Sequence, residues 1–503
     1  MNRRNSILAK VVICLFALNS LTLYVYFHPS TGSHPRLPVG NHVDRRSNFY
    51  LKPWPILPSY LPWTENSSVR HNSCEAYFGN GFTRRHDLLR PRGGSGWFRC
   101  FFSETLQSSV CEGGKVRMVP ERIRMSKGGE RLEDVMGRGE AEELPDFDDG
   151  AFEIDGGGGR SGELGLGFKR GRKLVDGEFL NNYVPEGGIS RHSMRDLIGS
   201  IRVVGSKEFV CDQWIKEPVL LVTRFEYANL FHTITDWYSG YVSSRVTGLP
   251  FRPHVIFIDG HCKSSMEETW NALFSGFSYA KSFNGSVCFR HAVLSPLGYE
   301  TAMFKGLTEH IDCKGASAHD LWKEPDDQRT ARISEFGEMV RAAFGFPVNR
   351  YHREKTSSSH KVLFVRREDY LAHPRHSGKP ESRLTNEQEV FDAIKTWASN
   401  HLDCKINLLN GLFAHVSMKE QVKAIQDASV IIGAHGAGLT HIVSATPKAI
   451  IFEIISSQYR RPHFALIAQW KGLEYHAMNL AGSYANPAEV VDKLQDIMKS
   501  LGC

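Results

Sequence analysis

A histidine and an aspartate one helical turn apart are the residues best placed for acid–base chemistry. His232 and Asp236 follow residues 219–222, an apolar run typical of a buried parallel strand. Residues four apart share one face of a helix, so one of the pair could deprotonate a sugar hydroxyl while the other orients it. Asp236 is the favoured base, because a carboxylate stays ionised at mildly acidic pH whereas histidine is partly protonated there. A solvated polar helix face is the alternative that this spacing leaves open.

A glycine-rich turn nearer the carboxyl terminus has the composition of an anion site. The apolar residues 430–432 run into Gly433-Ala434-His435-Gly436-Ala437-Gly438, after which a helix is expected. Glycines let the backbone approach a ligand closely, and the first N–H groups of a helix bind phosphate. The turn matches neither a Walker loop nor the dinucleotide fingerprint. It predicts diphosphate binding by His435, Gly436, Ala437 and Gly438, and a tight turn that only needs small residues is the alternative.

Two arginines and one glutamate are further candidates for contact with a nucleotide. Arg366 and Arg367 follow the apolar residues 362–365, and Glu453 lies inside the apolar run 449–455. Ligands of open α/β sheets bind at the carboxyl ends of the strands, where guanidinium groups can neutralise a diphosphate. A ribose diol is the expected partner of Glu453. The alternatives are a surface ion pair for one arginine and a satisfied buried carboxylate for Glu453.

The elements that must position these residues are alternating strands and helices. The alternation is clearest after residue 346, with strands expected at 362–365, 406–409, 430–432 and 449–455 and helices at 387–399, 418–428, 462–471 and 487–501. A similar rhythm begins near residue 219. The sequence therefore predicts an α/β protein with two Rossmann-like domains, at 66–345 and 346–503, which face a cleft and are joined by a hinge.

One segment reads as an insertion. Residues 127–172 mix acidic, basic and glycine residues and show little apolar surface to offset the entropy of ordering, so a disordered insertion is expected. The Asp-x-Asp candidate for a metal site, Asp146-Phe147-Asp148, lies within it. Carboxylates need a fixed scaffold to coordinate a cation, so no metal is expected there.

The amino terminus predicts a membrane anchor. Residues 11–27 are uncharged and follow Arg3, Arg4 and Lys10, which favours a cytosolic tail at 1–10, a transmembrane segment at 11–27 and a proline-rich stem at 28–65. A cleaved signal peptide is the alternative. The sequons at Asn66 and Asn284 agree with a lumenal body. Nine cysteines outside the anchor predict disulfides with at least one thiol left over. The net charge of +6, without a basic recognition helix, argues against binding to nucleic acid.

The motifs together resemble glycosyltransferase family 61. The resemblance rests on Gly433-Ala434-His435-Gly436-Ala437-Gly438-Leu439-Thr440, on Leu363-Phe364-Val365-Arg366-Arg367-Glu368, and on Asn229-Leu230-Phe231-His232 with Asp236. It covers nearly the whole chain except residues 155–171.

The resemblance implies a type II Golgi membrane enzyme of the GT-B fold. Such an enzyme would transfer xylose from UDP-xylose, with inversion and without an essential metal or other cofactor, to the 2-hydroxyl of the β-linked core mannose of GlcNAc-terminated N-glycans. Family members that add xylose or arabinose to cell-wall xylan are the first alternative. A non-catalytic nucleotide-sugar-binding Golgi protein is the second.

Overall fold

The computed structural model describes residues 49–57, 63, 69–157, 171–189, 191–315, 329–348, 359–367, 383–401 and 404–503. The predicted anchor at 11–27 and the sequon at Asn66 lie outside these residues. Among the residues that are described, no helix has the length and apolar character needed to cross a bilayer. Residues Arg46–Cys503 form one compact unit, separate from Met1–Arg45, and this larger unit holds the elements below.

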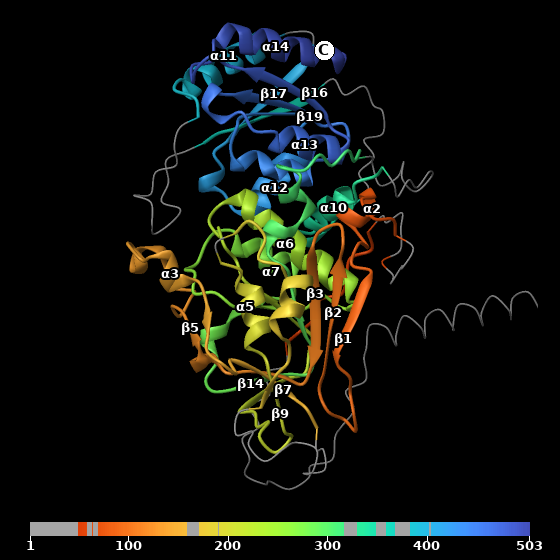
Figure 1. Cartoon of the computed structure of the whole chain (residues 1–503). Coiled ribbons are helices and arrows are strands. Elements are labelled where there is room, and N and C mark those ends of the chain that lie inside the picture. Colours follow the sequence, from red (N-terminus) through yellow and green to blue (C-terminus); the bar gives the residue numbers. More distant parts are fainter. Residues whose placement is uncertain are drawn as a thin grey trace, which may run out of the picture. The chain divides into compact units, whose positions relative to one another are not determined.

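The carboxyl-terminal part of the compact unit is built on a five-stranded parallel sheet (Figure 1). Its strand order is β17-β16-β18-β19-β20. The order reverses between β16 and β18, which creates a switch point of the kind where open α/β sheets bind ligands. The strands are β16 (Ser359–Val365), β17 (Lys405–Gly411), β18 (Val430–Ala434), β19 (Ile450–Ile455) and β20 (Glu474–Asn479).

Helices cover both faces of this sheet, as the alternating pattern predicts. Figure 1 shows α11 and α14 on one side of the strands and α12 and α13 on the other. Successive strand residues point to opposite faces: Leu363 packs into one apolar cluster and Phe364 into the other. The helices are α11 (Glu387–Asn400), α12 (Met418–Asp427), the 3-10 helix η6 (Ala437–Ser444), α13 (His463–Lys471) and α14 (Pro487–Ser500).

The amino-terminal part has a seven-stranded mixed sheet with the order β1-β2-β3-β15-β11-β12-β13. Four neighbouring strands are parallel and three are antiparallel. The parallel strands are β11 (Val219–Val222), β12 (His254–Phe257), β13 (Phe277–Tyr279) and β15 (Ala292–Leu294). The antiparallel strands are β1 (Arg84–Leu89), β2 (Trp97–Ser103) and β3 (Ser108–Gly114).

The two faces of this sheet are covered differently, which corrects the expectation of a second doubly wound unit. Helices α6 (Leu230–Val246) and α7 (Glu267–Leu273) pack on one face. On the other face Leu221 packs into a cluster shared with α5 (Ser193–Ser200) and a second sheet. That sheet has the order β10-β14-β4-β7-β9-β8. Its strands are β4 (Val116–Met118), β7 (Phe152–Asp155), β8 (Arg172–Lys173), β9 (Arg202–Val204), β10 (Gln213–Ile215) and β14 (Val287–Phe289).

The prediction of a disordered insertion is wrong for residues 127–157. Strand β7 lies in the second sheet with Phe152 and Ile154 fully buried, so a few apolar residues among the glycines suffice to fix the segment. The segment also contains η2 (Leu132–Val135), α3 (Glu140–Glu143) and β6 (Asp146–Phe147), which pairs with β5 (Ile123–Arg124). Asp146 and Asp148 each form an exposed ion pair with Arg124. Residues 158–170 lie outside the description.

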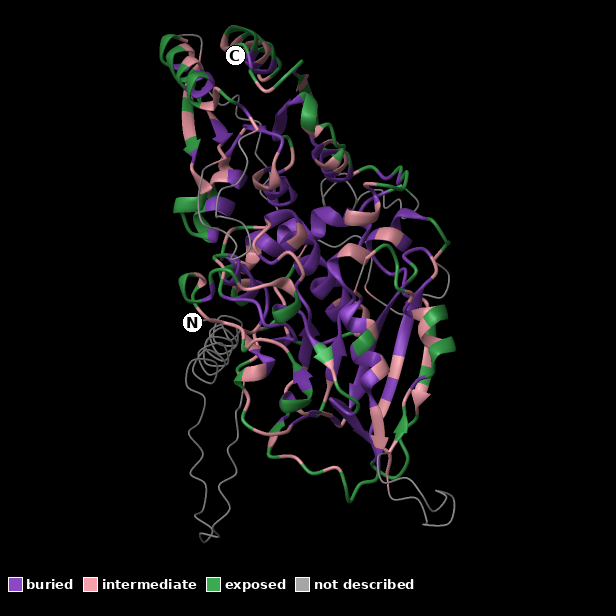
Figure 2. Ribbon diagram, turned by 60° about the vertical axis from the view of Figure 1, so that its left-hand side comes forward, coloured by how far each residue is buried: buried purple, intermediate pink, exposed green. Residues whose placement is uncertain are grey.

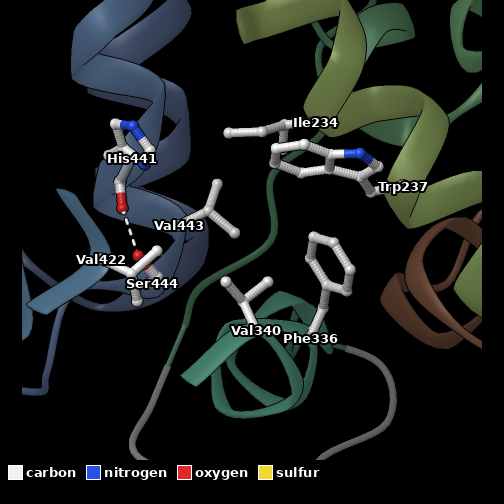
Figure 3. Close-up of a pocket in the computed structure, with 8 residues that line it drawn as sticks. All are labelled: Ile234, Trp237, Phe336, Val340, Val422, His441, Val443 and Ser444. Atoms are coloured by element: carbon white, nitrogen blue, oxygen red, sulfur yellow. Dashed lines mark hydrogen bonds between the residues drawn. The ribbon is translucent and has the colours of Figure 1, made fainter. Parts of the chain in front are cut away.

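An apolar core runs from the amino-terminal part into the carboxyl-terminal part. Figure 3 shows Ile234 and Trp237 of α6 facing Phe336 and Val340 of α10 (Ile333–Ala343), with Val443 of η6 beside them. The space between these side chains is about 10 Å³, at the lower limit of what one water molecule needs. Figure 2 likewise shows buried residues continuing between the sheets. The Arg341 guanidinium donates to the carbonyl oxygens of Ser444 and Ala445 at 2.7 and 2.9 Å, which ties α10 to the end of η6.

The stem prediction at 28–65 is wrong for its described carboxyl-terminal part, which packs on the body. We name residues 49–57 and 63 the docked segment. The Trp54 Nε1–H donates to the carbonyl oxygen of Leu249 at 2.9 Å. The Trp63 Nε1–H donates to Glu335 Oε1 of α10 at 2.6 Å, and this oxygen also accepts the hydroxyl of Tyr241 of α6 at 2.6 Å. The proline-rich composition predicted an extended spacer, but Trp54 and Trp63 fix this segment to the body.

Four disulfides confirm the cysteine prediction: Cys74–Cys313, Cys100–Cys111, Cys211–Cys288 and Cys404–Cys503. Cys262 is the buried free thiol. The remaining short helices of the described residues are α2 (Cys74–Phe78), η1 (Pro120–Arg122), α4 (Gly177–Tyr183), η3 (Ala280–Ser282), η4 (Gly298–Glu300), α8 (Ala302–Lys305), η5 (Phe413–His415) and η7 (Ser457–Tyr459).

Candidate active site

The amino-terminal end of α6 carries His232, and a buried ion-pair network fixes the loop before it. Asn229 caps α6, since its side-chain oxygen accepts the Phe231 N–H at 3.0 Å. Arg224, just after β11, is almost fully buried and pairs with Asp259 at 2.8 Å and with Glu267 at 3.1 Å. A buried guanidinium with two carboxylates leaves the loop little freedom, so His232 has a defined position.

His232 has the properties of a neutral base. Burial lowers the pKa of its imidazole to about 4, because an apolar environment disfavours the charged ring. No hydrogen bond from the described residues reaches its buried Nδ1. The ring is therefore neutral at mildly acidic pH, and a neutral imidazole has one nitrogen that can accept a proton.

Asp236, the base favoured from the sequence, occupies a different environment, which suits proton abstraction less well than that of His232. The carboxyl is buried, and burial raises its pKa well above the ordinary value. Its Oδ1 accepts the Gly298 N–H at 3.1 Å. The sequence correctly placed both residues on one face of α6. It gave no sign that the helix would bury the carboxylate more deeply than the imidazole.

A cavity of about 300 Å³ lies beside His232. Its lining comes from both parts of the compact unit: Phe231, His232, Phe304, Leu307, Arg461, Pro462 and His463. The His463 ring packs edge-on against Phe231 at 4.8 Å and lies 5.7 Å from the His435 ring. Burial lowers the pKa of His463 to about 4. Sequence reasoning missed Arg461 and His463, although Arg461-Pro462-His463 does stand at the expected start of a helix.

The switch point of the carboxyl-terminal sheet brings the predicted phosphate ligands together. Val365 and Gly433 are register partners in β16 and β18, so Arg366, Arg367 and the glycine-rich turn all follow neighbouring strand ends. A Cβ atom on Gly436 would lie 3.0 Å from Arg367 Nη1, which places this guanidinium against the turn.

The two arginines differ in their partners. Arg366 Nε lies 3.3 Å from Glu387 and its guanidinium stacks over Phe391. The buried Nε of Arg367 has no hydrogen-bond partner among the described residues. One arginine is thus in an ion pair, as the alternative held, whereas the guanidinium of Arg367 lies against the glycine-rich turn. A Cβ on Gly438 would lie 3.1 Å from Val365 Cγ1, so packing also requires a small residue at that position.

His435 and Glu453 form a buried pair. The His435 Nδ1 and Glu453 Oε1 are 2.5 Å apart, and the Tyr475 hydroxyl donates to Glu453 Oε2 at 2.5 Å. Glu453 is completely buried. Both of its oxygens are occupied, so the geometry matches a satisfied buried carboxylate and not a ligand for a ribose diol. The sequence missed Tyr475, because half-exposed β20 alternates polar residues and shows no apolar run.

The remaining predicted site residue lies on the surface. Asn284 is exposed in the turn before β14, as a glycan acceptor must be. The adjacent backbone is fixed by Asp212, whose Oδ2 accepts the Ser286 N–H and hydroxyl, both at 2.7 Å.

Comparison with known proteins places this geometry in a family. The family model described as Glycosyltransferase 61 matches residues 192–452. The chain is also 61% identical over 538 residues to a β-1,2-xylosyltransferase of Arabidopsis thaliana, with 100% of both chains covered. The chain belongs to glycosyltransferase family 61. The family-61 match contains His232, Asp236, Arg367 and His435 and ends before His463.

Two further family relatives show how far the similarity extends. The chain is 62% identical over 457 residues to β-1,2-xylosyltransferase RCN11 of Oryza sativa subsp. japonica, with 90% of this chain and 84% of that protein covered. It is 22% identical over 280 residues to an EGF domain-specific O-linked N-acetylglucosamine transferase of Gallus gallus, with 53% and 45% covered. Similarity along nearly the whole length is therefore seen with the two xylosyltransferases.

Proposed function

We propose that this family-61 glycosyltransferase is a β-1,2-xylosyltransferase. The donor is UDP-xylose, and the acceptor is the 2-hydroxyl of the β-linked core mannose of a GlcNAc-terminated N-glycan. The proposal is supported by the full-length identity to the Arabidopsis thaliana enzyme. The observation that carries it is the cavity with His232 on one side and His463, next to His435, on the other. This arrangement suits a GT-B enzyme, whose donor and acceptor parts face each other.

The proposed reaction is a single displacement with inversion. His232 takes the proton from the acceptor hydroxyl as its oxygen attacks the anomeric carbon of xylose, and the bond between that carbon and the diphosphate oxygen breaks. A new glycosidic bond forms and UDP leaves. Arg367 and the N–H groups at the start of η6 lie where they can stabilise the charge that develops on the diphosphate. Arg461, at the cavity wall, adds a second guanidinium.

We further propose that the enzyme is a type II membrane protein of the Golgi, with residues 1–10 in the cytosol and the catalytic body in the lumen. Four disulfides support an oxidising compartment, and exposed Asn284 suits a glycosylated one. No essential metal is proposed, since the candidate carboxylates Asp146 and Asp148 already neutralise Arg124.

A donor and acceptor matrix tests the proposal. The full-length protein in detergent is incubated with UDP-xylose, UDP-arabinose or UDP-GlcNAc and with a GlcNAc-terminated N-glycan or a xylan oligomer, with and without EDTA. Mass spectrometry should show one pentose added to the N-glycan from UDP-xylose, and EDTA should not abolish it. Transfer to xylan alone would replace the proposed acceptor, and UDP binding without transfer to either would mean a non-catalytic protein.

A further inference from the structure

Three aromatic side chains form a continuous wall next to His232. Tyr299 lies 5.2 Å from the His232 ring, 5.3 Å from Phe225 and 4.4 Å from Phe304, measured between ring centroids. Phe304 also lies 5.9 Å from His232 and lines the cavity. We name Phe225, Tyr299 and Phe304 the aromatic wall. All three are only half-buried, so they keep apolar surface in contact with solvent.

The wall lies on the His232 side of the cavity, which Phe304 lines, while Tyr299 and Phe225 continue the row of rings beyond it. Phe225 follows β11, and Tyr299 and Phe304 follow β15, two strands that are neighbours in the amino-terminal sheet. The predicted diphosphate ligands follow β16 and β18 of the other sheet. In a single displacement the base contacts the attacking hydroxyl, so the rings nearest His232 lie nearest the acceptor. An acceptor sugar offers C–H groups on the face of its ring and hydroxyls at the edge, which suits aromatic side chains with one polar tip.

We propose that the aromatic wall is the acceptor subsite, on which one sugar ring of the glycan stacks with its attacking hydroxyl at His232. This assignment rests on the proposed transferase function. The phenylalanines supply the apolar surface, and the Tyr299 hydroxyl supplies a hydrogen bond to the edge of the sugar.

Asp236 positions this wall. Its Oδ1 accepts the N–H of Gly298, the residue before Tyr299, at 3.1 Å. A Cβ on Gly298 would come within 2.5 Å of the same oxygen, so the helix and the loop are in close contact. The Glu300 side chain closes the amino-terminal end of the short helix η4 by accepting the N–H of its N-cap, Leu297, at 2.8 Å. The backbone just before Tyr299 is therefore fixed to α6 and to the start of η4.

Steady-state kinetics of wall variants test the subsite. Tyr299→Leu and Phe304→Leu should each raise the KM for the glycan by about tenfold, which is the loss of affinity expected when one aromatic contact is removed. The KM for UDP-xylose should change much less than the KM for the glycan. Tyr299→Phe, which keeps the ring, should raise the glycan KM less than Tyr299→Leu. The matched control is Trp214→Leu, an exposed aromatic residue on β10 outside the cavity.

Direct binding separates failure of the subsite from failure of the proposed function. Calorimetry with UDP present should show weaker glycan binding to Tyr299→Leu than to wild type, whether or not transfer occurs. Equal glycan affinity of the two proteins would overturn the subsite, and so would an equal rise in both KM values. Absence of xylose transfer by the wild-type protein would instead overturn the proposed function.

Discussion

The assignment of His232 as base and Asp236 as a neutral positioning group predicts opposite results for two conservative variants. Asp236→Asn keeps an oxygen where Oδ1 accepts the Gly298 N–H. Because burial raises the pKa of this carboxyl and so favours its neutral form, the neutral amide is a close substitute. We expect kcat within about threefold of wild type, which corresponds to less than 1 kcal/mol. His232→Asn removes the general base, and loss of such a group costs about 10²- to 10⁴-fold in kcat.

A third variant measures the hydrogen bond of Asp236 itself. Asp236→Leu leaves the Gly298 N–H without its acceptor, and a buried unpaired donor costs about 1–3 kcal/mol of unfolding free energy. Transfer of xylose to the N-glycan is followed by mass spectrometry, and thermal unfolding of each variant controls for folding. The reasoning is refuted if Asp236→Asn loses as much kcat as His232→Asn while its melting temperature stays that of wild type.

Three further predictions follow from the structure. Glu453→Leu should raise the KM for UDP-xylose in the wild-type protein but have little added effect when His435 is already replaced by alanine. The reason is that Glu453 acts through the His435 ring, to which it is hydrogen-bonded. Additive effects of the two substitutions would contradict this role. Removal of residues 1–68 should lower the melting temperature, whereas removal of residues 1–45 should not. The longer deletion removes the docked segment, whose Trp63 donates a hydrogen bond to Glu335. Equal melting temperatures of the two truncated proteins would show that the segment is dispensable. The free energy of unfolding should fall between pH 7 and pH 5. Burial lowers the pKa of His441 to about 3 in the folded protein, whereas in the unfolded chain this ring takes up a proton below its ordinary pKa of 6.5. This one ring accounts for about 2 kcal/mol, and a flat profile would contradict its burial.

The sequence predicted the carboxyl-terminal sheet closely, because buried parallel strands such as 430–432 have continuous apolar residues. It also placed His435 and Arg367 at one edge of that sheet, since alternating strands and helices imply parallel strands, whose carboxyl ends share one edge. It missed β20, whose exposed edge needs few apolar residues, and with it the hydroxyl of Tyr475.

The amino-terminal half was harder to predict for physical reasons. The strand at Phe152 was missed because its few apolar residues lie among glycines and charged residues. The packing of Trp54 was missed because the surrounding prolines predict an extended segment. Burial in the folded protein raises the pKa of Asp236, and the N–H that its carboxyl accepts belongs to Gly298, which is 62 residues away; no spacing rule reports such an environment. Local periodicity thus predicts elements, whereas the environment of a side chain comes from distant residues.

The central claim is that a nucleotide diphosphate binds where β16 and β18 end, facing His232 across the cavity. Hydrogen–deuterium exchange of the full-length protein with and without UDP measures this most directly. We predict slower exchange in peptides that cover residues 362–367 and 433–441, and loss of that protection in Arg367→Ala. Protection elsewhere, with both peptides unchanged, would contradict the account.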